Sequence, residues 1–188
     1  MLRGDVETMY IKNLFGHFFT ITNHRNKVFW HCIRAGIPVR GLMHDISKYS
    51  FAEFWIGVKY YQGGNRSPNE EERSHHGCSM AWMHHKGRNR HHFEYWTDYW
   101  PPTKTIEAVK MPTKFVIEMF CDRIAACKVY MKKSYTQDAP LNYYLRAKGR
   151  LFIHKETDLF LEKLLTLLAE KGEKETFKYI RTIRKKDY

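Results

Sequence analysis

The five residues from His44 to Lys48, with the sequence His-Asp-Ile-Ser-Lys, combine side chains that suit metal-assisted phosphate chemistry. A neutral imidazole nitrogen and a carboxylate oxygen from adjacent residues can bind one divalent cation. Lys48 follows Asp45 by about one helical turn, so its ammonium can reach the same place and meet a phosphate. A His-Asp pair also occurs by chance in many proteins, so its meaning depends on where further ligands lie.

Further candidate ligands are abundant in this sequence. Seven of the 11 histidines lie between residues 44 and 92, namely His44, His75, His76, His84, His85, His91 and His92. Three more lie upstream, at His17, His24 and His31. Downstream, Asp122 stands in an apolar segment, where a carboxylate has to be paired or metal-bound because burial of a free charge is costly. The alternative partner for Asp122 is a basic residue such as Lys48.

The order of these residues resembles the HD-domain superfamily of metal-dependent phosphohydrolases, whose signature is H…HD…D with extra histidines in dinuclear members. The segment after His44 is similar to the H-D-I-G-K form of HD-GYP phosphodiesterases, but the Gly-Tyr-Pro element is absent, so cyclic-dinucleotide specificity is not implied. A closer resemblance is to a small uncharacterised family of bacterial and phage proteins with H-D-x-S-K-F/Y-S followed by A-W-x-H-H-x-x-x-N-x-H-H. These motifs correspond to residues 44–50 and 81–92, and the resemblance covers about residues 20–130.

The resemblance implies a metal site with four ligands, His24, His44, Asp45 and Asp122. In that family a histidine stands twelve residues before the glycine that ends its helix, which matches His24 and Gly36. His31 is the alternative first ligand, although its position between Trp30 and Cys32 is more typical of a packed core imidazole. Ligands of these types suit Mn, Fe, Ni, Zn or Mg, as one ion or two.

The segment from His84 to His92 could supply a second metal site or a general acid for the leaving group. Its candidate members are His84, His85, Asn89, His91 and His92. If a helix continued through Gly87, His85, Asn89 and His92 would share one face, and His84 and His91 another. We favour the first face, but the spacing alone does not decide between them. Arg88 and Arg90, together with Lys48, are expected to neutralise a phosphate.

The net charge of +12 indicates anionic partners. Phosphorylated small molecules, nucleic acid or an anionic membrane surface would all fit, although basic residues scattered in this way are typical of a solvated surface. No apolar stretch is long enough to cross a bilayer, and the first residues lack a signal-peptide pattern. The four cysteines form no C-x-x-C pair, so we expect reduced thiols in a cytoplasmic protein without a membrane partner. The oligomeric state stays open.

The hydrophobic pattern is helical nearly throughout and predicts an all-α fold. Together with the resemblance, it predicts a single compact HD-domain-like helical bundle over residues 1–188, with a motif core at about 20–130. Helices are expected over about residues 5–22, 23–35, 38–45, 50–62, 112–133, 156–171 and 173–184. The helix at Ser50 has a capping-box spacing to Glu53. Another helix should reach His85, break near Gly87 and restart around Asn89, and no convincing strand pattern is present.

These observations lead to one expected function and two alternatives. The resemblance implies a metal-dependent phosphohydrolase that acts on a nucleotide or another phosphate ester. HD-like folds also include di-iron oxygenases with a similar ligand order, and histidine and carboxylate ligands suit iron as well. The third hypothesis is a non-enzymatic module that binds nucleic acid through its positive charge, which predicts strongly salt-dependent binding.

Overall fold

The computed structural model describes the backbone of residues 3–186 and the side chains of residues 8–186. Within this part of the chain, eight α-helices and one two-stranded sheet are connected by short turns and 3-10 helices. The helices are α1 (Arg3–Ala35), α2 (Pro38–Met43), α3 (Phe51–Lys59), α4 (Pro68–His76), α5 (Met80–Lys86), α6 (Thr113–Met131), α7 (Ala139–Ala147) and α8 (Lys155–Ile183). The strands are β1 (Thr97–Trp100) and β2 (Thr105–Ala108). The all-α prediction is therefore confirmed.

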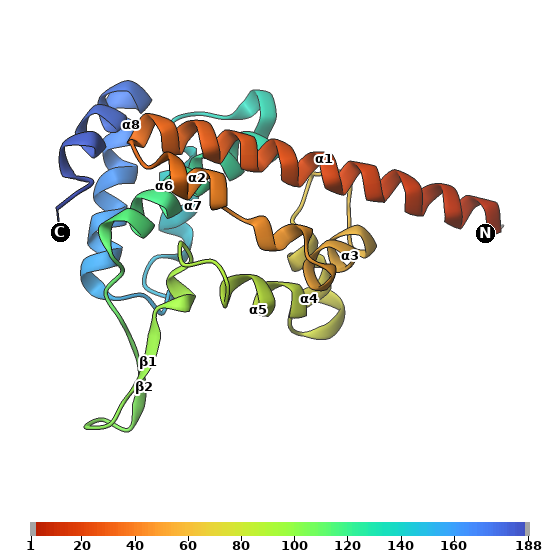
Figure 1. The fold of residues 1–188 in the computed structure, drawn as a ribbon, viewed down its shortest axis with the longest axis horizontal. Coiled ribbons are helices and arrows are strands. Elements are labelled where there is room, and N and C mark those ends of the chain that lie inside the picture. The colour runs from red at the N-terminus through yellow and green to blue at the C-terminus, as the bar shows by residue number, and fades with distance from the viewer. Residues whose placement is uncertain (1–2, 187–188) are drawn as a thin grey trace.

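Helix α1 is a single long element, and the prediction of two helices meeting at Asn23 was wrong. No proline or positive-φ glycine interrupts the chain between residue 3 and Gly36, so the helix continues until Gly36 ends it with φ 78°. Most of its length lies along the body of the molecule, and its N-terminal end projects beyond the body (Figure 1).

The hydrophobic core lies where α1, α6 and α8 meet. Helix α6 is the central element, because side chains on most of its circumference are buried, as expected for a helix inside a bundle. Its predicted extent, from Pro112 to about Lys133, agrees closely with the observed bounds. Completely buried members of the core include Phe120, Ile124, Tyr144, Leu161 and Leu165.

The two predicted C-terminal helices are the two parts of α8, which is broken at Gly172. This glycine has φ 75° and ψ 172°, a conformation that L side chains rarely adopt. At the break, Glu173 N donates to Gln137 Oε1 at 2.9 Å. The second part of α8 can therefore turn back against α1 and α6.

The hairpin formed by β1 and β2 contradicts the expectation that the chain has no strands. The strands pair antiparallel, with Thr97 opposite Ala108 and Tyr99 opposite Ile106. Each strand has only four residues, and almost all of them are exposed, so no apolar alternation marks them in the sequence. The hairpin projects away from the helices (Figure 1). Helix α7 was also not predicted.

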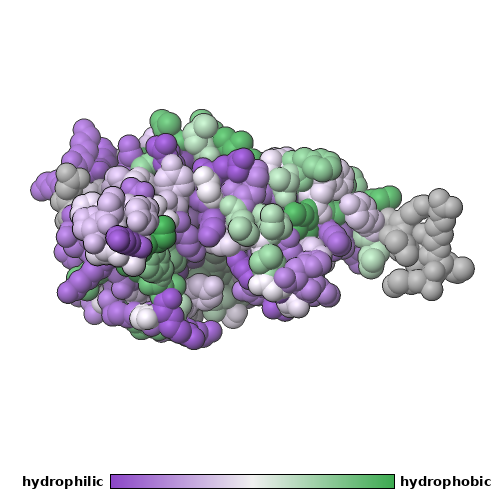
Figure 2. Space-filling model, turned by 90° about the horizontal axis from the view of Figure 1, so that it is seen from below, coloured by the Kyte–Doolittle hydropathy of each residue, from purple (hydrophilic) through white to green (hydrophobic). Residues whose placement is uncertain are grey.

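The surface seen in Figure 2 is largely hydrophilic, with apolar patches, some of them near the projecting part of α1. Among the described helices, none combines the length and the apolar character needed to cross a membrane.

Candidate metal centre

His44 and Asp45 lie in a sharp turn between α2 and the 3-10 helix Ile46–Tyr49, and the prediction that a short helix carries them was wrong. Asp45 has φ 52° and ψ 25°, the left-handed conformation that aspartate adopts more readily than most residues. Adjacent residues of a helix point about 100° apart. In the turn, His44 Nε2 and Asp45 Oδ2 instead lie 3.3 Å apart.

The four residues expected to bind a first metal converge on one place, although 98 residues separate His24 from Asp122 in the sequence. His24 comes from α1, and its Nε2 lies 2.9 Å from Asp122 Oδ1 on α6. His44 Nε2 lies 3.7 Å from the same oxygen. Asp45 Oδ2 is 3.8 Å from His24 Nε2. His24, His44 and Asp122 therefore offer ligand atoms within 4.8 Å of one another.

A second group of histidines approaches the other oxygen of Asp45. His85 Nε2 lies 3.2 Å from Asp45 Oδ1, and His91 Nε2 lies 3.4 Å from it. His92 also offers a ligand atom to this group, within the same 4.8 Å limit. Asp45 thus directs one carboxylate oxygen toward each of two groups of potential ligands.

The structure does not divide the segment from His84 to His92 into the two helical faces that the sequence predicted. Helix α5 ends at Lys86, and the following residues form turns without a new α-helix at Asn89. The prediction that His85, Asn89 and His92 form the set of ligands was wrong in two respects. His91 lies in the group, whereas the amide of Asn89 donates to Ser47 Oγ and to the His85 carbonyl, each at 2.8 Å.

Two buried glutamates that were not among the predicted site residues orient the histidines. Glu118, on α6, is completely buried and accepts hydrogen bonds from His44 Nδ1 at 3.1 Å and His91 Nδ1 at 3.3 Å. Arg40 Nε donates to its other oxygen at 2.7 Å. A carboxylate that binds Nδ1–H leaves the Nε2 lone pair free to bind a metal. Each group of potential ligands therefore has one histidine held by Glu118.

Glu53 has the same relation to the two histidines of α5. It accepts from His85 Nδ1 at 2.7 Å and from His84 Nδ1 at 2.6 Å. The spacing of Ser50 and Glu53 predicted a capping box, but Ser50, at the start of α3, makes no side-chain capping bond. His84 is thus linked to the cluster through Glu53 and is not one of its ligand candidates.

The unsatisfied polar atoms of the cluster show that its composition suits a metal ion. Among the described residues of the cluster, five buried side-chain atoms make no hydrogen bond of acceptable geometry: His24 Nε2, His44 Nε2, Asp45 Oδ1, His91 Nε2 and His92 Nε2. An unpaired buried polar atom costs about 1–3 kcal/mol, so a concentration of them is unusual unless a ligand binds there. Imidazole nitrogens with carboxylate oxygens are suitable ligands for divalent transition metals. The cluster could therefore hold a metal ion.

The electrostatics keep the carboxylates ionised. Burial alone would raise the pKa of Asp45, but His44, Lys48 and His85 hold it well below its usual range. Burial likewise opposes ionisation of Glu118, yet hydrogen bonds from His44 and His91 lower its pKa to about 2. The same carboxylates outweigh the effect of burial on His44 and raise its pKa. Metal binding at His44 Nε2 requires the neutral ring and would release this proton.

Lys48 lies at the solvent-exposed side of the cluster, and its ammonium is 2.8 Å from Asp45 Oδ2. Lys48 therefore forms its ion pair with Asp45, and not with Asp122 as the alternative prediction had it. Burial favours the neutral amine, but Asp45 and Asp122 raise the pKa of Lys48 above its usual range. The Lys48 side chain is 28% exposed and that of Asp122 is 18% exposed, so solvent reaches the cluster here.

Three other predicted site residues do not join the cluster. Arg88 is exposed and contacts the carbonyl of His84, and Arg90 lies over the ring of Tyr95. His31 is buried away from the cluster and stacks on Phe177, with its Nε2 accepting from Lys128 Nζ at 3.1 Å. It is a core residue, as its position between Trp30 and Cys32 suggested.

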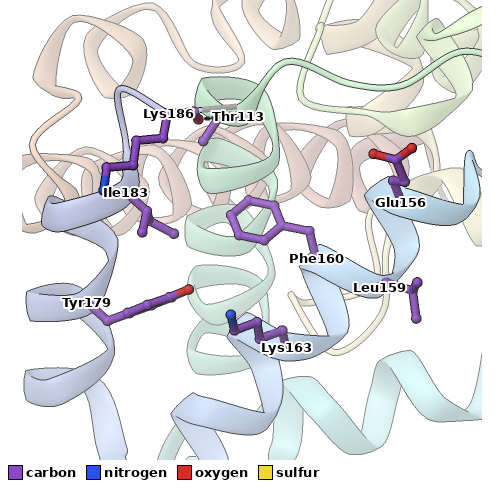
Figure 3. A pocket seen from close by; sticks show the side chains of 8 residues that line it. All are labelled: Thr113, Glu156, Leu159, Phe160, Lys163, Tyr179, Ile183 and Lys186. Atoms are coloured by element: carbon purple, nitrogen blue, oxygen red, sulfur yellow. Dashed lines mark hydrogen bonds between the residues drawn. The ribbon is translucent and has the colours of Figure 1, made fainter. Parts of the chain in front are cut away.

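Two surface pockets lie apart from the cluster. One, of about 510 Å³, lies between α1 and the loop that contains Tyr61 and Gly64. The other, of about 430 Å³, lies between the two parts of α8 and the start of α6, where Lys163 and Tyr179 approach each other (Figure 3). Neither pocket is lined by one of the candidate metal ligands.

The fold and the cluster define a mostly α-helical protein with a buried candidate metal centre. Residues 13–167 match the model of a family described as "Family of unknown function (DUF5662)", and the chain belongs to this family. No curated protein and no solved structure matches the chain.

Proposed function

We propose that this protein is a metal-dependent phosphohydrolase with a dinuclear centre. The observation that carries the proposal is the position of Asp45, whose two oxygens face two different groups of histidines. A carboxylate placed in this way can bridge two cations, an arrangement used by many enzymes that hydrolyse phosphate esters. The resemblance of the ligand order to HD-domain phosphohydrolases supports the same function.

The two groups differ in the residues that would hold each cation. His24, His44 and Asp122 would bind one ion together with Asp45. The other ion would be bound by Asp45 with three histidines, His85, His91 and His92. Divalent cations in such a centre act as Lewis acids toward a phosphoryl oxygen and generate a nucleophile from water at neutral pH.

Lys48 would bind the phosphate of the substrate. It lies beside Asp45 at the exposed side of the centre and remains charged because two carboxylates raise its pKa. When Asp45 binds cations, the ammonium loses part of its attraction to this carboxylate and becomes available to a phosphate oxygen. The net charge of +12 favours an anionic substrate in the same way, which agrees with a nucleotide or another phosphate ester.

His84 is our candidate for the proton donor to the leaving group. Its side chain is 21% exposed, and its Nδ1 donates to Glu53, so the ring is held by a carboxylate while part of it reaches solvent. A histidine oriented by a carboxylate is a common general acid or base. Because Glu53 also holds His85, the position of His84 is tied to the centre.

The substitution Asp45→Asn tests the proposal. Asparagine has nearly the same shape but lacks the charge that holds divalent cations, so metal per chain should fall and hydrolysis should be lost. Elemental analysis and a panel of phosphomonoester and phosphodiester substrates, with circular dichroism to check the fold, measure these effects. Asp98→Asn, in the exposed hairpin, is the matched control and should change neither property.

Two outcomes contradict the proposal. Metal stoichiometry that is unchanged in Asp45→Asn would exclude the bridging role of this residue. An iron-containing preparation with visible absorption and no activity on any phosphate ester would support the oxygenase alternative.

A further inference from the structure

Helix α6 leaves one strip of its surface open to solvent, and this strip starts at a candidate metal ligand. The residues of α6 before Asp122 are almost all buried. From that point onward, one side of the helix is partly or fully exposed at residues spaced by one, three or four positions, namely Asp122, Arg123, Ala126, Cys127 and Tyr130. The strip is therefore a surface along which a molecule bound at Asp122 can extend.

Tyr130 reaches back from the far end of this strip toward the candidate metal centre. It follows Asp122 by eight residues, which places its Cα about 12 Å further along the helix axis. Side chains of a helix point toward its N-terminus, so the phenol of Tyr130 covers the turn that contains Ala126. Ala126 has only a methyl group, so α6 itself does not fill the space between the phenol and Asp122.

The electrostatics of Tyr130 place its phenol beside Lys48 and Asp122. Burial raises the pKa of the phenol, Lys48 lowers it and Asp122 raises it. Against the effect of burial, Tyr130 in turn joins Asp45 and Asp122 in raising the pKa of Lys48. All three side chains are partly exposed, and Tyr130 is 37% exposed. Lys48, Asp122 and Tyr130 therefore border one opening.

The phenol keeps a hydrogen that it can donate into this opening. Because burial raises the pKa of Tyr130 above its usual value, the phenol stays protonated at neutral pH. A hydrogen bond with Ser67, at the start of α4, lowers the same pKa, as a bond does in which the serine hydroxyl donates to the phenol oxygen. The phenolic hydrogen is thus left for a ligand that accepts hydrogen bonds.

Two donors at one opening distinguish between the two kinds of phosphate ester. A phosphomonoester has three non-bridging oxygens and a charge of about −1.5 to −2 at neutral pH. A phosphodiester has two such oxygens and a single charge. Lys48 supplies a positive charge and Tyr130 a neutral donor, in addition to the cations proposed at Asp45. The third oxygen and the second charge of a monoester match this larger set of partners.

We propose that Lys48 and Tyr130 together bind the phosphate group and select phosphomonoesters over phosphodiesters. The Lys48 ammonium and the Tyr130 phenol each donate to a phosphate oxygen, and the organic group of the ester extends along the exposed strip of α6. Tyr130 is thus a substrate-binding residue outside the set of candidate metal ligands. This inference rests on the proposed function, because it assigns the substrate class of the same site.

Binding of inorganic phosphate to Mn²⁺-loaded protein tests the role of Tyr130 without turnover. Tyr130→Phe removes only the hydroxyl group, and loss of a hydrogen bond to a charged group should raise the Kd for phosphate by about 10-fold or more in isothermal titration. Elemental analysis should find the same metal content in the variant and the wild type. Tyr143→Phe, at an exposed position of α7, is the matched control and should bind phosphate as the wild type does.

Hydrolysis of p-nitrophenyl phosphate and of bis(p-nitrophenyl) phosphate tests the substrate class. Wild-type protein should prefer the monoester, and Tyr130→Phe should lower kcat/KM for the monoester by about 10-fold, mainly by raising KM. The reaction of the diester should change little, so the preference for the monoester should narrow. A purely structural role of Tyr130 would instead slow both reactions equally, and that result would overturn the inference.

The inference and the proposed function fail in different ways. A wild-type protein that hydrolyses phosphate esters but prefers the diester would refute the inference and leave the proposed function standing, as would equal binding of phosphate by Tyr130→Phe and the wild type. A lower metal content in Tyr130→Phe would also refute it, because the residue would then act on metal binding. Absence of both metal and hydrolysis in the wild type would remove the proposed function, and the inference would fall with it.

Discussion

Replacement of Glu118 by glutamine should weaken both cation sites at once. Glu118 accepts from His44 Nδ1, His91 Nδ1 and Arg40 Nε, and the two histidines belong to different groups of ligands. The carboxamide of glutamine has one accepting oxygen, and its NH2 group can only donate. The two histidines share Oε1 and Arg40 binds Oε2, so at least one donor loses its acceptor whichever way the amide turns. In either orientation both histidines also lose the negative charge that raises the basicity of their Nε2 atoms.

The size of the effect follows from the number of histidines that Glu118 orients. Loss of a hydrogen-bond partner behind a metal ligand typically lowers metal affinity about 10- to 100-fold, or about 1.4–2.8 kcal/mol. Because Glu118 orients one histidine in each group, we expect a loss of this size at each site. Glu53→Gln provides the contrast, because among the candidate ligands Glu53 orients only His85. That variant should weaken only the site that contains His85.

Isothermal titration of the metal-free protein with Mn²⁺ measures both affinities. Glu162→Gln is a suitable control, since Glu162 forms a surface ion pair with Lys148 and should affect neither site. Unchanged affinity at both sites in Glu118→Gln would refute the reasoning. Loss of a single site in Glu118→Gln would show that only one of the two histidines depends on this carboxylate.

Two further predictions concern stability. Burial lowers the pKa of His17 from 6.5 to about 4, so between these pH values the unfolded chain binds more protons and stability falls as the pH falls. His17→Gln should remove this part of the loss of stability in acid, which amounts to at most about 3 kcal/mol. Urea unfolding at several pH values measures it, and an equal pH dependence in the variant and the wild type would contradict the prediction. Phe120 is fully buried against the ring of Phe177. Its replacement by alanine should lower the free energy of unfolding by about 3–5 kcal/mol. The exposed Phe152→Ala should change stability by less than about 0.5 kcal/mol in the same assay, and similar losses in both variants would contradict the assignment of the core.

Elements with strong local signals could be predicted from the sequence. Pro112 precedes α6, and the apolar residues that follow define a buried helix that carries Asp122. Gly172 separates the two parts of α8 because its backbone conformation excludes other residues. In these cases the signal lies within a few residues of the feature itself.

The arrangement of the centre depends on contacts between distant segments, which local patterns do not contain. The left-handed turn at Asp45 and the turns after Gly87 decide which histidine atoms face one another, and both differ from the helices predicted there. Glu118 was overlooked, although it lies four residues before Asp122 in the same apolar helix and the cost of burial applies to it equally. Glu53 was assigned to a capping role, because the spacing of a capping box does not distinguish this role from a long-range contact.

The position of α1 in the chain has a consequence for biosynthesis. Its buried side packs against α6 and, to a similar extent, against α2, and α6 begins only at Thr113, so almost eighty residues separate the end of α1 from α6. During translation, the side of α1 that packs against α6 therefore leaves the ribosome before its partner helix has been synthesised. Such nascent chains are prone to aggregate and depend on chaperones. Slow synthesis at low temperature would prolong this exposed stage, whereas a higher chaperone supply would protect the chain until α6 is complete.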